Sequence, residues 1–181
     1  TNLAVGLRVM KAYMYSSDLV LMSLQLIQDR PDLAESIVAD ALGERIGRIT
    51  NTEFTTYAGG DGPQGIIRGS VSALTSGAAG VVTADELQRL KYAVNRAYRQ
   101  RPNRAYMMAD ATLATVLRLK DANANYLFTS PNSADEPRVW GERVIVNNDM
   151  PALATGNFAV LFGDLSQYKI RTVRGMHLLR L

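Results

Sequence analysis

Cysteine is absent from this chain of 181 residues, and histidine occurs once, at His177. These absences exclude disulfide bonds, Cys-ligated zinc, iron–sulfur clusters, thiol nucleophiles and multi-histidine metal sites. The longest apolar run, residues 19–27, is interrupted by Ser23 and Gln25 and is shorter than the roughly 20 residues needed to cross a bilayer. We therefore expect a soluble protein with no membrane partner.

The composition is that of an ordinary globular protein, with 47% hydrophobic and 20% charged residues. This length predicts one domain or two small ones. The net charge of +3 is a weak indicator of any partner. Because the chain begins at Thr1, without a Met or a basic leader, we expect a processed or excised piece with no address signal.

In the first half, the alternation of residues 9–15 predicts a strand, whereas residues 18–28 fit a helix or an extended chain equally well. Asp32, with Glu35 three positions later, predicts an N-cap that opens a helix over residues 32–58. Gly43 and Gly47 each cost about 1 kcal/mol in a helix, which predicts a closely packed neighbour. The apolar stripe of this helix comprises Leu33, Ile37, Ala41, Leu42, Ile46, Ile49, Phe54 and Tyr57.

A glycine-rich loop, residues 59–65, ends the predicted helix, and Ile66 and Ile67 are expected to resume an extended path. The small and polar residues 69–80 predict a connection between two halves. We place the boundary near Ser72, which divides the chain into domains at residues 1–72 and 73–181.

The second half has an α/β pattern. Thr83 and Glu86 form a capping box that predicts a helix ending at Arg101, and either Asp110 or Thr112 is expected to cap another helix. Residues 129–138 predict a polar loop. The predicted strands cover residues 105–109, 143–146, 159–162, 168–173 and 176–181.

Residues Gly60 to Gly65 match the G-x-G-x-x-G nucleotide-binding pattern, and Asp85 lies about 20 residues later. That pattern binds a pyrophosphate only where a strand enters the loop and a helix leaves it. Here a predicted helix enters and an extended segment leaves, and Pro63 lacks an amide hydrogen. The sequence therefore favours a tight loop over a nucleotide site.

No other residues assemble a predicted catalytic, cofactor or metal site. His177, the only candidate base for a serine nucleophile, lies in a late predicted strand, where a structural role is favoured. Four aspartates each lie beside a turn or a cap, which explains an Asp there without a metal-binding or acid–base role; they are Asp61, Asp110, Asp149 and Asp164. A basic cluster remains, which comprises Arg96, Arg99, Arg101 and Arg104 around Tyr98, although cations are also favoured at a helix C-terminus. Trp140 is a single aromatic residue and not a stacking platform.

An ordered series of short segments resembles the tailed-bacteriophage major capsid protein family, although no single segment is specific. The resemblance covers nearly the whole chain. The series comprises Lys11 to Tyr15 before Ser17-Asp18-Leu19, the long helix, Tyr57 to Ile67, Thr83-Ala84-Asp85-Glu86-Leu87, Ala109-Asp110-Ala111-Thr112-Leu113-Ala114, Trp140-Gly141, Asp149-Met150-Pro151, Phe162-Gly163-Asp164 and Arg174-Gly175-Met176.

The resemblance implies an α+β coat-protein fold, with a spine helix in a peripheral region and an α/β axial region. It implies a non-enzymatic subunit that self-assembles into an icosahedral shell around double-stranded DNA, in a virion capsid assembled in the bacterial cytoplasm. Implied partners are other copies in hexamers and pentamers, packaged DNA in non-specific contact, and candidate scaffold, protease and portal proteins.

The family's N-terminal arm, extended loop and C-terminal strands are not matched in this sequence. Because some members form a Lys–Asn cross-link with residues of the extended loop and the C-terminal region, no cross-linking residue is assigned to this chain. Two alternatives stay open: an encapsulin-like compartment, and an α/β nucleotide-binding enzyme that uses Gly60 to Gly65.

Overall fold

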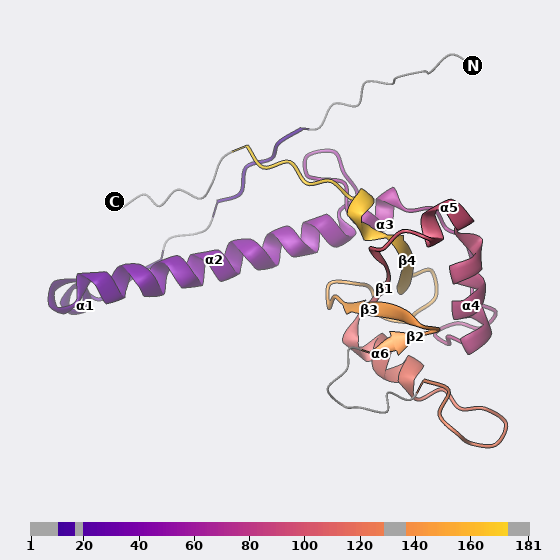
Figure 1. The fold of residues 1–181 in the computed structure, drawn as a ribbon. Coiled ribbons are helices and arrows are strands. Elements are labelled where there is room, and N and C mark those ends of the chain that lie inside the picture. The colour runs from indigo at the N-terminus through magenta and orange to yellow at the C-terminus, as the bar shows by residue number, and fades with distance from the viewer. Residues whose placement is uncertain (1–10, 17–19, 129–136, 174–181) are drawn as a thin grey trace, which may run out of the picture. The chain divides into compact units, whose positions relative to one another are not determined.

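The computed structural model describes residues 11–16, 20–128 and 137–173, which form two compact units (Figure 1). The first unit contains the described residues up to Gly65, together with residues 170–173, and the second runs from Ile66 to Lys169. Together they combine helices with a mixed sheet, which confirms the predicted α+β class.

Helix α2, Pro31–Thr56, dominates the first unit, and the short helix α1, Leu24–Asp29, lies against it (Figure 1). With 26 residues, α2 is about 39 Å long. Pro31 occupies its first position, where a proline has the required φ and needs no amide hydrogen. The predicted N-cap was therefore wrong: Arg30 is the N-cap and forms no side-chain cap bond, while Asp32 lies inside the first turn.

Two further predictions for the first unit have no support among the described residues. A Cβ added at Gly43 or at Gly47 would have no atom of the described residues within 4 Å, so the expected close neighbour is missing from the described part of this chain. Lys11 to Tyr15 form no strand, although the hydroxyls of Tyr13 and Tyr15 donate to the Gly60 carbonyl and the Glu53 carboxylate; Val9 and Met10 lie outside the described residues. The undecided segment 18–28 forms α1 from Leu24 onward.

The second unit is built on a four-stranded sheet with the order β2-β3-β1-β4. Strands β1, Arg104–Met108, and β3, Glu142–Val146, run parallel, with Tyr106 opposite Val144. Strand β4, Val160–Asp164, is antiparallel to β1, and β2, Arg138–Val139, is antiparallel to β3. The predicted strands 105–109, 143–146 and 159–162 are confirmed to within two residues at each end.

Helices α4, Ala84–Ala93, and α6, Asp110–Leu117, contribute apolar side chains to the core of this unit. The ring of Tyr106 is fully buried, with its centroid 4.6 Å from that of Phe162, and its hydroxyl donates to the Leu87 carbonyl at 2.9 Å. The buried core comprises Leu87, Tyr106, Met108, Leu113, Val116, Val139, Val144 and Phe162.

The helix predicted from the Thr83 capping box divides into two pieces. The box itself is confirmed: Thr83 Oγ1 accepts from the Glu86 amide at 3.3 Å, and Glu86 accepts from the Thr83 amide at 2.9 Å. However, α4 ends at Ala93, because the Asn95 side chain accepts from the Ala97 amide and starts the separate helix α5, Arg96–Arg99. A side chain that caps a new helix competes with continuation of the old one.

Other element predictions in the second unit need correction. Ile66 and Ile67 begin a short helix, α3, Ile66–Gly69, and do not continue an extended path. The N-cap of α6 is Ala109, without a side-chain cap bond, and not Asp110 or Thr112. After β4, Asp164 accepts from the Ser166 amide and turns the chain into the 3-10 helix η1, Leu165–Gln167, and the predicted strand 168–173 is not formed. The strand predicted at 176–181 lies outside the described residues.

Candidate functional site

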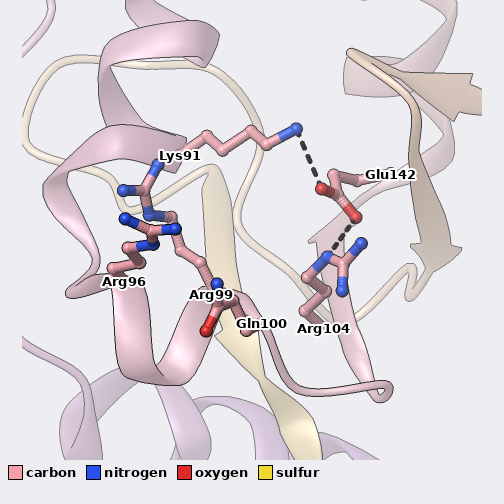
Figure 2. A pocket seen from close by; sticks show the side chains of 6 residues that line it. All are labelled: Lys91, Arg96, Arg99, Gln100, Arg104 and Glu142. Carbon is pink, nitrogen blue, oxygen red and sulfur yellow. Dashed lines mark hydrogen bonds and ion pairs between the residues drawn. The ribbon is translucent and has the colours of Figure 1, made fainter.

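The basic cluster predicted from the sequence lies at an open hollow of about 470 Å³ in the second unit (Figure 2). Arg96 and Arg99 come from α5 and Arg104 comes from β1. The residues that line the hollow are Lys91, Arg96, Arg99, Gln100, Arg104 and Glu142. Four cationic side chains thus face a single carboxylate.

Glu142, the first residue of β3, is almost completely buried and pairs with two cations. One carboxylate oxygen lies 2.8 Å from Lys91 Nζ, and the other accepts from Arg104 Nε at 2.7 Å (Figure 2). Burial alone would raise the pKa of Glu142, but the hydrogen bonds and positive charges of Lys91 and Arg104 lower it below its usual value. Glu142 therefore stays ionised and joins α4, β1 and β3.

Arg101 does not line the hollow. It lies over the Tyr98 ring at 5.1 Å, and its Nη1 donates to Asp164 Oδ2 at 3.1 Å. The hydrogen bond from the Ser166 hydroxyl, together with that from Arg101, lowers the pKa of Asp164 although burial opposes it. These contacts give Asp164 a structural role at the end of β4.

The turn between β2 and β3 supports one wall of the hollow. Trp140 and Gly141 both have positive φ, of 51° and 77°, and connect the antiparallel pair Val139 and Glu142, as in a two-residue hairpin loop. A positive φ is unusual for Trp, and several contacts hold it. Its indole nitrogen donates to the Ala84 carbonyl at 3.1 Å, its own carbonyl accepts from Lys91 Nζ at 2.9 Å, and its ring packs edge-on against Phe128.

The Gly60 to Gly65 loop belongs to the first unit and has the geometry of a tight connection. Helix α2 enters it, the Gly65 amide donates to the Tyr57 carbonyl at 2.8 Å, and Ala58 and Gln64 form an isolated β-bridge. A Cβ at Gly65 would lie 2.7 Å from the Thr55 carbonyl oxygen, and one at Gly62 would meet the Tyr57 ring. Close backbone and ring approach therefore accounts for these glycines without a phosphate.

The remaining candidates do not come together. His177 lies outside the described residues. Asp61 lies within the glycine loop, Asp110 lies in the first turn of α6, and Asp149 follows β3. In the described part of the chain, no group of three or more His, Cys, Asp and Glu residues could hold a metal ion. Over the same residues, no helix combines the length and apolarity that a membrane span requires.

Sequence reasoning missed Lys91 and Glu142 as members of the hollow. Lys91 is in the last turn of α4, and Glu142 starts a strand more than 40 positions later. No local pattern links them, because only the pairing of β1 with β3 brings Glu142 beside Arg104. The acidic residue directly before the predicted strand 143–146 was the one available signal.

Over residues 6–181, the sequence matches the Phage capsid family, and the chain belongs to that family. The solved structures it is similar to include the capsid of a native GTA particle, with 29% identity over 72% of this chain and a TM-score of 0.64. The capsid of an empty GTA particle is similar too, with 27% identity over 78% of this chain and a TM-score of 0.65.

The chain covers about half the length of these capsid chains, 53% and 52% respectively. No curated protein matches it. These similarities confirm the predicted resemblance and the capsid-type α+β fold, and they give no support to an encapsulin-like compartment or a nucleotide-binding enzyme.

Proposed function

We propose that this chain is part of a major capsid protein, which assembles with copies of itself into an icosahedral shell around double-stranded DNA. The observation that carries the proposal is the family match over residues 6–181. The similarity to capsid chains of native and empty GTA particles supports it. The role is structural, and the proposed location is the virion capsid, after assembly in the cytoplasm of a bacterial host.

Within this proposal, residues 1–72 form a peripheral region and residues 73–181 an axial region that meets its own copies in hexamers and pentamers. Repeated head-to-tail contacts around a rotation axis close such rings. The half-exposed apolar side chains of α2, Leu33, Ile37 and Ile49, support a subunit whose surfaces are covered on assembly. Packaged DNA is contacted without sequence preference, and scaffold, protease and portal proteins are further proposed partners.

The test is to produce the full-length gene product and examine it by electron microscopy and sedimentation. Closed shells of uniform diameter are expected, and nuclease treatment of particles from infected or induced cells should leave protected DNA of mixed sequence. A protein that stays strictly monomeric at high concentration would contradict the proposal. Shells that hold a protein cargo and no DNA would instead indicate a compartment.

A further inference from the structure

The charges of the hollow are not balanced within the described chain. Glu142 uses one oxygen for Lys91 and the other for Arg104, so this carboxylate already satisfies two of the four cations. Arg96 and Arg99 stand on the opposite side of the hollow from Glu142 (Figure 2). Neither forms an ion pair with any Asp or Glu of the described residues.

Arg99 is held in place although it lacks an anion. Its guanidinium lies over the Tyr92 ring, 4.5 Å from the centroid, which fixes the orientation of its planar group. Its Nε is buried without a hydrogen-bond partner among the described residues. An unpaired buried donor is unfavourable, so the described residues leave the guanidinium of Arg99 incompletely satisfied at the hollow that it lines.

A carboxylate fits this arrangement better than a larger anion does. A guanidinium presents parallel N–H donors whose spacing matches the two oxygens of a carboxylate. The hollow is open at the surface and large enough to admit an acidic side chain. Because Lys91 and Arg104 are already paired with Glu142, Arg96 and Arg99 are the cations of the hollow that are left for an incoming carboxylate.

We propose that Arg96 and Arg99 form a carboxylate-binding site that receives an Asp or Glu side chain of a second copy of this chain. The inference rests on the proposed function, because family membership makes another copy the partner whose surface is repeatedly presented to this one. It adds to that function a specific polar contact between subunits, next to the prearranged Lys91–Glu142–Arg104 group.

The experiment uses the full-length protein with both arginines reversed, Arg96→Glu and Arg99→Glu. Arg89→Glu is the matched control, because Arg89 is an exposed α4 residue that does not line the hollow. The double variant should keep the circular-dichroism melting curve of the control but give at least tenfold fewer shells by sedimentation. Shells at the control yield would overturn the inference while leaving the proposed function intact.

The partner carboxylate is found by changing each Asp and Glu of the full-length chain to Arg in turn. The reversed acid and the reversed pocket should each fail to assemble alone, and a chain that carries both reversals should assemble again, because every contact between its copies is then complementary. If no acid variant restores assembly in the reversed-pocket chain, the inference is wrong.

Two further outcomes would also contradict it. Normal shells of the double variant that have lost protected DNA would make the hollow a phosphate site. Failure of wild-type and Arg89→Glu proteins to form shells would contradict the proposed function itself, and the inference with it.

Discussion

At the scale of single residues, two kinds of glycine in the first unit differ in what surrounds them. Gly65 is buried, and a Cβ there would lie 2.7 Å from both the Thr55 carbonyl oxygen and the Tyr57 amide nitrogen. Gly43 lies in α2, where a Cβ would meet no described atom within 4 Å. The first glycine is required by close packing, and the second is not required by any contact within the described chain.

Replacing each of these glycines with Ala should therefore have opposite effects on stability. Gly43→Ala should stabilise the unassembled full-length protein by about 0.5–1 kcal/mol, the usual difference between these residues in a helix. Gly65→Ala should destabilise it by about 1–3 kcal/mol, because backbone must move to relieve the overlap. Urea unfolding measures both, and shifts of the same sign would refute this account.

Sequence patterns predicted best those features that depend on neighbouring residues. The Thr83–Glu86 capping box is local, and it was predicted correctly. The start of α2 is also local, but the competing signals of Pro31 and Asp32 led to the wrong residue. Proline at the first helical position already fixes the backbone, so an additional Asp cap was unnecessary.

At the scale of elements, Glu86 links helix α4 to the segment before it. Its carboxylate accepts from the Gly77 amide at 2.8 Å, the Ser76 hydroxyl at 2.9 Å and the Thr83 amide at 2.9 Å. Burial would raise the pKa of Glu86, but these hydrogen bonds lower it from 4.5 to about 2. The carboxylate therefore binds its proton less readily in the folded state than in the unfolded state.

A lowered pKa contributes stability above pH 4.5, and this stability is lost as the pH falls toward about 2. Glu86→Gln should cost on the order of 1 kcal/mol at pH 7, because hydrogen bonds to a partly exposed charge are weaker than buried ones. The stability difference between wild type and Glu86→Gln should be smaller at pH 3, which lies between the unfolded-state pKa of 4.5 and the folded-state pKa of about 2. Urea unfolding at both pH values tests this, with Asp85→Asn as a control that keeps the three bonds. An unchanged difference at pH 3 would contradict it.

Tyr106 connects strand β1 with helix α4 through its hydroxyl and with strand β4 through its ring. Tyr106→Phe should cost about 1 kcal/mol, the net value of one buried hydrogen bond. Tyr106→Ala should cost about 3–5 kcal/mol, because it also leaves a cavity. The control is Tyr92→Phe, an exposed position where little change is expected. Chemical denaturation measures the free energy of unfolding of each variant. Equal decreases for Tyr106→Phe and Tyr92→Phe would contradict a stabilising role for the Tyr106 hydroxyl.

At the scale of the whole molecule, the sequence predicted individual strands but not how they pair. The parallel register of Tyr106 with Val144 joins segments almost 40 residues apart, and it could not be read from either segment alone. The same pairing brings Glu142 beside Arg104, so the membership of the hollow was equally hidden. The resemblance to a known family conveyed the architecture that local periodicity could not.

The left-handed backbone of Trp140 has a consequence for any partner of the second unit. Its indole, carbonyl and ring attach the hairpin turn to α4 and to Phe128, while Lys91 reaches both this turn and Glu142. The side chains of Lys91, Arg104 and Glu142 are thus fixed in one arrangement before any partner docks at the hollow. A subunit that docks there would lose little conformational entropy at these three side chains, so less of the binding free energy would be offset by ordering them.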